Sequence, residues 1–220
     1  MDPAETGGDA PGQNPGQRNT AEVREDALLR IQENPERILA DYKERFGNVL
    51  NADNAAEIFP AYAASVESRT RFRVAVHPAA QWVRDELFRR SLTDPDVHQV
   101  IFTAGGNGAG KTSGGISGDL VMDSTLSNRE HSESLLQAAL DAGKEVAVVY
   151  TYRPILDSLN GVLDRSMTEG RTVSISTLIK AHEGAVRSVA AIYDKYFDDP
   201  SVRFPLVDKR RESRTVGRCT

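Results

Sequence analysis

The sequence has little cysteine, few aromatic residues and no long apolar run, and each shortage excludes a class of protein. Cys219 is the only cysteine among 220 residues, so no disulfide can form within the chain and a reducing compartment is expected. No apolar run approaches the roughly 18 residues of a membrane span, and the N-terminus lacks the basic-then-apolar order of a signal peptide. We therefore expect a cytoplasmic protein without a membrane partner.

Charge and histidine content narrow the choice further. The net charge of -5 gives no reason to expect nucleic acid as the main ligand. The 4 histidines are scattered and show no metal-ligand spacing. With 39% hydrophobic and 27% charged residues, the composition is that of an ordinary globular protein, and the length suits one sizeable domain.

The two ends differ in composition from the middle. Residues 1–19 carry four glycines and three prolines and no large apolar residue after the first methionine, which predicts a disordered leader. Residues 209–220 form a basic tail, which is either solvated or in contact with an adenine pocket or a partner. Between them we expect a single domain over residues 20–208, whose first part, residues 20–46, forms N-terminal helices.

Hydrophobic periodicity predicts alternating strands and helices within this domain. Strands are predicted at "NVL" (48–50), "HQVIFTA" (98–104), "DLVMD" (119–123), "EVAVVYTY" (145–152) and "VRFPLV" (202–207). Helices are predicted from Thr20, from Pro35, from Pro78 to about Arg90, from a capping box of Ser127 and Glu130, from Pro154, and over about 175–197. This alternation favours an α/β fold with a mostly parallel sheet flanked by helices.

A glycine-rich segment, "GGNGAGKT" at residues 105–112, lies between a predicted strand and a predicted helix and fits the pattern G-x-x-x-x-G-K-[ST]. Successive backbone N–H groups of such a loop form an anion-binding nest, and the following helix adds its dipole. Lys111 would reach the β- and γ-phosphates of ATP, and the Thr112 hydroxyl would bind Mg²⁺. The alternative is a glycine-rich turn without a ligand. The predicted nucleotide-binding residues are Gly105, Gly106, Asn107, Gly108, Ala109, Gly110, Lys111, Thr112 and Ser113.

Three further segments resemble the zeta-toxin kinases, a family of P-loop enzymes. "NADNAAEIFPAY" (51–62) resembles the family's D-x-D…P-x-[YF] segment, with Asp53 at the catalytic base and Asn51 where the family has its first aspartate. "VMDSTLS" (121–127) resembles the strand that ends in E-G-T, so Asp123 and Thr125 fall on substrate-binding positions. Residues 152–182 resemble the two-arginine segment, in which Arg165 and Arg171 would hold phosphate and transition-state charge.

The order of these segments differs from that of the family. In zeta toxins the D-x-D segment follows the P-loop, whereas here it precedes the P-loop by about fifty residues. Lys111 and the next predicted strand leave room for only a short helix between them. We therefore expect a circularly permuted order, which leaves spatial neighbours in place. In that arrangement "NADNAAEIF" (51–59) forms a strand that pairs in parallel beside the P-loop sheet.

The resemblance covers roughly residues 47–207 and implies a P-loop NTPase-like fold and a kinase. ATP with Mg²⁺ would phosphorylate a hydroxyl of a small acceptor, such as the nucleotide sugar UDP-N-acetylglucosamine, and an antitoxin protein would restrain the toxicity. A small-molecule kinase of another purpose stays open, as does a nucleotide-binding module or slow regulatory NTPase that acts through a protein partner.

The residues also have plainer interpretations. Asp53 and Asp123 could be cap residues at element ends, Arg165 could solvate a helix face, and Arg171 could lie in a loop.

Overall fold

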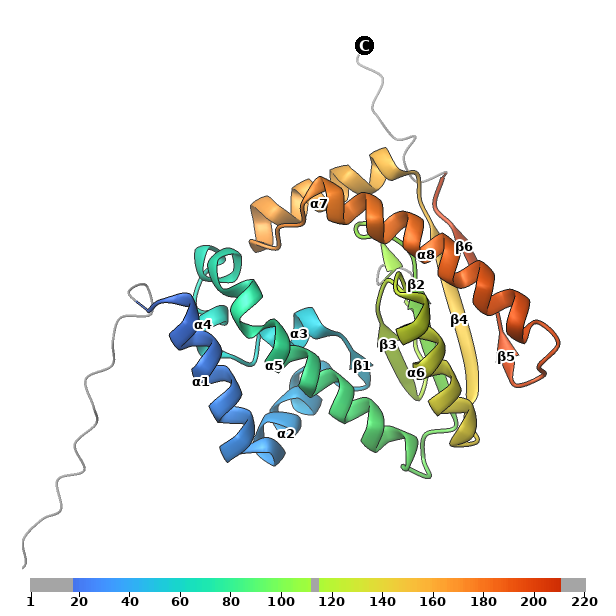
Figure 1. Ribbon diagram of the computed structural model, residues 1–220, viewed down its shortest axis with the longest axis horizontal. Coiled ribbons are helices and arrows are strands. Elements are labelled where there is room, and N and C mark those ends of the chain that lie inside the picture. Colours follow the sequence, from blue (N-terminus) through green and yellow to red (C-terminus); the bar gives the residue numbers. More distant parts are fainter. Residues whose placement is uncertain (1–17, 112–114, 211–220) are drawn as a thin grey trace, which may run out of the picture.

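The structure is a computed structural model that describes residues 18–111 and 115–210 (Figure 1). Its helices are α1 (Thr20–Glu33), α2 (Pro35–Phe46), α3 (Ala52–Ala56), α4 (Pro60–Ala63), α5 (Val66–Leu92), α6 (Arg129–Asp141), α7 (Ile155–Glu169) and α8 (Ile175–Tyr196). Its strands are β1 (Val49–Leu50), β2 (Gln99–Ala104), β3 (Leu120–Asp123), β4 (Glu145–Tyr152), β5 (Val202–Arg203) and β6 (Leu206–Asp208). The predicted α/β class is confirmed.

The strands form one sheet in the order β1-β3-β2-β4-β5, and β6 also pairs with β4. Every one of these pairings is parallel. β2 ends at Ala104, directly before the glycine loop, and lies between β3 and β4. Because parallel strands end on the same side, the segments that follow β1, β3, β2 and β4 meet at one rim of the sheet.

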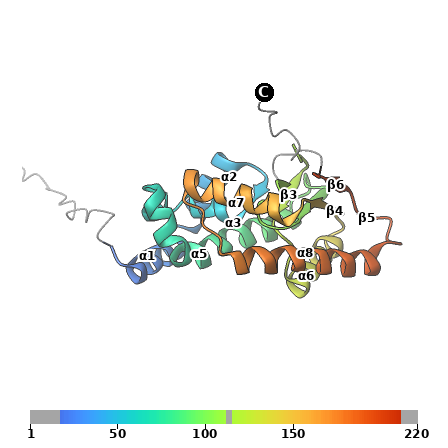
Figure 2. The ribbon, with the colours of Figure 1, turned by 90° about the horizontal axis from the view of Figure 1, so that it is seen from above.

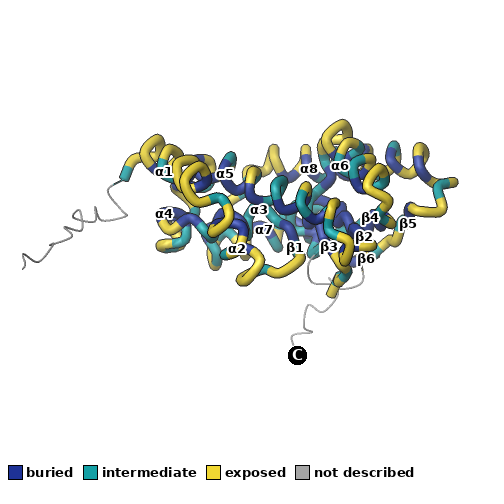
Figure 3. Tube along the Cα trace, turned by 90° about the horizontal axis from the view of Figure 1, so that it is seen from below, coloured by how far each residue is buried: buried dark blue, intermediate teal, exposed yellow. Residues whose placement is uncertain are grey.

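The main core lies between one face of the sheet and helices α5, α6 and α8, which run along the same side of the molecule in Figure 2. Phe102 and Met122 of the sheet are fully buried there, together with Leu136 of α6 and Ile192 of α8. The ring of Phe88 on α5 packs edge-on against Phe102, with 6.0 Å between the ring centres. Buried residues accordingly concentrate in the strands and on the helix sides that face them (Figure 3).

The opposite face of the sheet carries a smaller cluster. Ile101, Val121, Ala147 and Val149 are buried there, and Ile116 packs against them. Ile116 belongs to residues 115–119, which form no helix, so the short helix expected after Lys111 is not found in this described part of the segment. The predicted ligands Thr112 and Ser113 lie outside the described residues.

The N-terminal helices pack beside the sheet rather than on it (Figure 1). α1 buries Val23, Ala27 and Ile31 and packs against α5. Its N-cap is Asn19, which forms a reciprocal capping box with Glu22. The prediction of two helices over residues 20–46 is confirmed by α1 and α2.

Two predicted helix starts were wrong. Pro78 does not open a helix; it lies inside α5, which begins twelve residues earlier at Val66. The first half of α5 buries Phe72, Ala75 and Val76, and this apolar face outweighs the roughly 3 kcal/mol that an internal proline costs. The capping box of Ser127 and Glu130 is also replaced.

The actual N-cap of α6 is Asn128, whose side chain accepts a hydrogen bond from the His131 amide. Asparagine caps a helix as well as serine does, so two adjacent cap residues left the start of this helix ambiguous.

The segment "NADNAAEIF" was predicted to be a strand, and this was wrong as well. The strand is confined to Val49 and Leu50, which pair in parallel with β3, and the chain then turns into α3. The turn has a local cause, because the Asn51 side chain accepts hydrogen bonds from the amides of Asp53 and Asn54 and so caps the helix.

The predicted basic tail begins at Lys209, which is buried, and its amide donates to the Tyr152 carbonyl at 2.9 Å. The ordered chain therefore reaches at least this residue. Of the leader predicted over residues 1–19, residues 1–17 lie outside the described residues, as does the tail from 211 onward, whereas Asn19 is ordered as the N-cap of α1. Among the residues that the structure describes, no helix is both long and apolar enough to cross a membrane.

Tyr42 fixes the end of β1. Its side chain is fully buried, its hydroxyl donates to the Val49 carbonyl at 2.6 Å, and the same oxygen accepts from the Asn51 amide at 2.8 Å. Tyr42→Phe leaves both backbone groups without this partner, so we expect a loss of about 1–3 kcal/mol of unfolding free energy, measured by chemical denaturation. Tyr193→Phe, at a half-exposed tyrosine of α8, is the control and should change little.

The pH dependence of the stability of the wild-type protein and of Tyr42→Phe gives a second test of this hydroxyl. Burial raises the pKa of Tyr42 to about 12, so the unfolded chain releases this proton first as the pH rises above about 10. Wild-type stability should fall between these two values, and the fall should be smaller in Tyr42→Phe. Equal stability of the two proteins at neutral pH would contradict the role of the hydroxyl.

Candidate active site

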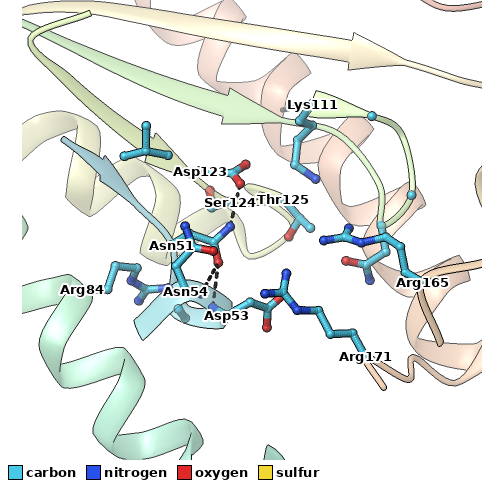
Figure 4. Close-up of a pocket in the computed structure, with 15 residues that line it drawn as sticks. Asn51, Asp53, Asn54, Arg84, Lys111, Asp123, Ser124, Thr125, Arg165 and Arg171 are labelled. Carbon is cyan, nitrogen blue, oxygen red and sulfur yellow. Dashed lines mark hydrogen bonds between the residues drawn. The ribbon is translucent and has the colours of Figure 1, made fainter. Parts of the chain in front are cut away.

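A pocket of 480 Å³ opens at the rim where β1, β3 and β2 end (Figure 4). All residues that the sequence predicted as catalytic or substrate-binding line it, namely Asp53, Lys111, Asp123, Thr125, Arg165 and Arg171. Of the predicted glycine loop, Asn107, Gly108 and Gly110 line it as well. The fold thus brings four segments that are distant in sequence to one cavity.

The glycine loop (residues 105–111 of the motif) packs against α7 and α8 on the side away from the pocket. Gly108 has φ +75°, and a Cβ atom there would collide with the Ser158 carbonyl of α7. A Cβ atom at Gly106 would lie 2.6 Å from Nδ1 of His182 on α8. The guanidinium of Arg153 donates to the Gly108 carbonyl at 3.2 Å. Only glycine fits at these two positions. The absence of side chains there lets the loop backbone pack directly against the helices that lie behind the pocket.

Lys111 bends back over this loop. Its Nζ donates to the carbonyls of Gly105 and Gly106 at 3.1 and 3.2 Å. Burial lowers the pKa of Lys111, and the nearby Asp123 carboxylate partly opposes that shift. The ammonium is thus partly shielded from water, and an anion in the pocket would stabilise its charge.

Asp123 ends β3 and is held through both carboxylate oxygens. Its side chain is only 9% exposed. Oδ1 accepts from the Thr103 hydroxyl of β2 at 2.7 Å, and Oδ2 accepts from Nδ2 of Asn51 at 2.6 Å. Thr125, two residues further on, shares a hydrogen bond with the Ser127 hydroxyl at 2.9 Å, and its carbonyl accepts from the Gly105 amide. This turn therefore ties β3 to the glycine loop.

Asp53 lies in the first turn of α3 and reaches the pocket from the side of β1 (Figure 4). Its carboxylate is 37% exposed and lies 3.6 Å from the guanidinium of Arg73. A partly exposed carboxylate with one distant cation keeps oxygen lone pairs available, so Asp53 can accept a proton from a group bound in the pocket.

Arg165 and Arg171 extend into the pocket from the opposite side, where α7 ends (Figure 4). Arg165 is 3.5 Å from Glu169. Arg171 is better enclosed and lies 3.4 Å from Glu169 and 3.5 Å from Glu57. These ion pairs hold both guanidinium groups at the edge of the pocket.

Sequence reasoning missed two arginines of α5. Arg84 lines the pocket with a side chain that is 12% exposed and pairs with Asp85 at 2.7 Å, and Arg73 pairs with Asp53. Arg69, Arg73 and His77 recur at intervals of four residues, which places them on one helix face. This signal was present in the sequence, but the false helix start at Pro78 separated these residues from Arg84.

The charge of the pocket is opposite to that of the chain. Its lining includes the four cations Arg84, Lys111, Arg165 and Arg171 and the two carboxylates Asp53 and Asp123, whereas the whole chain carries -5. Such a lining fits a polyanion such as a nucleoside triphosphate with Mg²⁺.

Asp123 offers the carboxylate oxygen that Mg²⁺ or its water ligands prefer. Within residues 18–111 and 115–210, no group of three or more His, Cys, Asp and Glu side chains could hold a metal ion on its own.

The packing behind the loop predicts a specific steric effect. Gly108→Ala should weaken ATP binding strongly, because the new methyl group displaces the loop from Ser158 and the pocket. Gly143→Ala is the matched control, since Gly143 has φ +72° but open space around its Cβ position. Both variants carry the strain of a left-handed residue, about 1–2 kcal/mol, but only Gly108→Ala should lose ATP affinity in calorimetry. Similar affinities in the two variants would exclude the steric role of α7.

A family model for the zeta toxin family matches residues 117–215, just under half of the chain. The match includes Asp123, Thr125, Arg165 and Arg171, while the glycine loop and Asp53 lie outside it. No curated protein matches the chain. This part of the chain is therefore similar to the zeta toxins, a P-loop kinase-like family.

Proposed function

We propose that this protein is a zeta-toxin-like kinase that transfers the γ-phosphate of ATP to a hydroxyl of a nucleotide-sugar-like acceptor, such as UDP-N-acetylglucosamine. The observation that carries the proposal is the arrangement of one pocket, in which the Asp53 carboxylate faces Lys111, Arg165 and Arg171. Phosphoryl transfer to a hydroxyl requires a carboxylate near the acceptor and cations around the transferred group.

Bound ATP and Mg²⁺ supply the phosphoryl group and neutralise part of its charge. The backbone of the glycine loop and the ammonium of Lys111 hold the phosphates, and the hydroxyl of Thr112 is assigned to the metal. Asp53 accepts the proton of the acceptor hydroxyl at its exposed carboxylate. Arg165 and Arg171 stabilise the negative charge that spreads over the equatorial oxygens in the transition state.

Asp123 and Thr125 are assigned to the substrate side of the pocket. Asp123 is the last residue of β3 and Thr125 follows it, and the end of β3 lies between those of β1 and β2. Asp123 is fixed by two hydrogen bonds, so its carboxylate direction is set before any ligand enters. A preset carboxylate of this kind can orient a substrate hydroxyl or a metal-bound water.

The proposal includes a permuted segment order relative to the zeta toxins. The sheet order supports it. β1 comes before the P-loop strand β2 in the chain, but it pairs in parallel with β3, which places the segment after β1 at the same rim as the glycine loop. Asp53 therefore stands at the rim beside Lys111 although its segment comes before the P-loop. The restraint by an antitoxin and the cytoplasmic location are proposed from the family resemblance and the composition.

The rival function is a nucleotide-binding module or slow regulatory NTPase that acts through a protein partner. Lys111, which donates to the carbonyls of its own loop, would bind the nucleotide in both functions. Incubation with ATP and a metabolite extract distinguishes the two functions. A kinase produces a new phosphorylated metabolite, whereas the rival produces none.

Lys111→Ala should reduce ATP affinity by at least about 10-fold, the scale of one or two lost charge-assisted hydrogen bonds, without a change of fold. Lys144→Ala is the control, since Lys144 donates to the Asp94 carbonyl at the opposite rim, before β4. Calorimetric titration with ATP measures both. Wild-type affinity in Lys111→Ala would overturn the nucleotide site.

Asp53→Asn should keep ATP binding but lower the rate of transfer by roughly 10² or more, because the amide cannot accept the proton. Asp141→Asn provides the control at the C-terminus of α6, where Asp141 accepts a hydrogen bond from Gln137 at the far rim. Turnover of both variants is measured with the acceptor that the metabolite-extract assay reveals. An unchanged rate in Asp53→Asn would show that Asp53 is not the base and serves only as a residue of the first turn of α3.

A further inference from the structure

Asn51 touches both acidic residues of the pocket through its single amide group. Its Nδ2 donates to Oδ2 of Asp123 at 2.6 Å. Its Oδ1 accepts from the amide of Asp53 at 2.6 Å and from that of Asn54 at 3.4 Å. One side chain therefore links the end of β3 to the helix that carries Asp53 (Figure 4).

The residue type follows from these contacts. A side-chain amide carries a donor and an acceptor on two separate atoms without a charge. An aspartate at position 51 would cap α3 equally well, but it would point a second carboxylate at Asp123, and like charges at this distance repel. Serine would also cap the helix, but its side chain is too short to reach Asp123.

Both ends of the link are anchored in the core. The backbone amide of Asn51 donates to the buried Tyr42 hydroxyl on α2, and the other oxygen of Asp123 accepts from Thr103 on β2. Hydrogen bonds thus connect Tyr42, Asn51, Asp123 and Thr103 across three strand ends, through the backbone of Asn51 on one side and its side chain on the other.

We propose that Asn51 is a positioning residue that sets the distance between Asp53 and Asp123. The inference rests on the proposed function, in which Asp53 is the base. Loss of the Nδ2 donor leaves α3 capped, but Asp123 is then held by Thr103 alone, and the two carboxylates can shift relative to each other. The substrate hydroxyl then no longer meets Asp53 in the reactive geometry.

Kinetics of two variants that retain the cap test this role. Asn51→Ser and Asn51→Asp should lower kcat by about 10- to 100-fold, the usual effect of removing a partner that orients an active-site ligand. The KM for ATP should stay near its wild-type value, because the glycine loop is untouched. If Asn51 serves only as a helix cap, both variants keep the wild-type kcat, and that result would overturn the proposal.

Asn19→Asp is the matched control. Asn19 caps α1, its Oδ1 accepts from the Glu22 amide, and its Nδ2 donates to the Glu22 carboxylate at 2.6 Å. The substitution places a carboxylate against a carboxylate at a helix cap, as Asn51→Asp does, but away from the pocket. It should leave kcat unchanged, and a loss equal to that of Asn51→Asp would also contradict the proposal.

A measurement without ligands separates this inference from the proposed function. In a double-mutant cycle of Asn51→Ala and Asp123→Ala, the Tm decrease of the double variant should be smaller than the sum of the single decreases, because the two residues share one contact. The effect of losing the α3 cap is the same with and without the Asp123→Ala substitution, so it cancels from the interaction between the two residues. Additive decreases would overturn the proposed coupling of Asn51 to Asp123. If the cycle is non-additive but the wild-type protein transfers no phosphate, only the proposed kinase function is overturned.

Discussion

The carboxylate of Asp123 is the group on which the geometry of the site depends. A buried carboxylate without partners is strongly unfavourable, and here the two partners come from the two neighbouring strands, Thr103 from β2 and Asn51 from the end of β1. Since β3 lies between these strands, satisfying one charge fixes three strand ends relative to one another. The acidic side of the pocket is thereby determined by the sheet rather than by loops.

The basic side of the pocket depends on α7 and α8. α7 contacts the glycine loop at Gly108 and also carries Arg165, and Arg171 follows at its end. The helix that shapes the phosphate loop therefore also delivers the cations that face it. Movement of α7 would change the loop and the arginines together, so binding of phosphate and alignment of the transition-state charges are coupled through one element.

Much of this arrangement could be predicted from local patterns. The unbroken apolar runs identified β2, β3 and β4, and the glycine motif identified the loop. The failed predictions had one distant and one local cause. Pro78 is tolerated inside α5 because of the core beneath that helix, whereas the Asn51 side chain caps α3 where a strand was expected. The contact between Asn51 and Asp123 joins residues 72 positions apart, which no spacing rule can detect without the fold.

The cations of the pocket differ in what they already bind. Arg171 has Glu57 and Glu169, and Arg84 has Asp85, so a bound phosphate must compete with carboxylates there. Lys111 donates to two neutral carbonyls, and burial already disfavours its charge. Exchange of carbonyls for an anionic phosphate gains more than exchange of one anion for another. Affinity for the triphosphate is therefore expected to reside mainly in Lys111 and the loop, and the arginines serve chiefly the charge that develops during transfer.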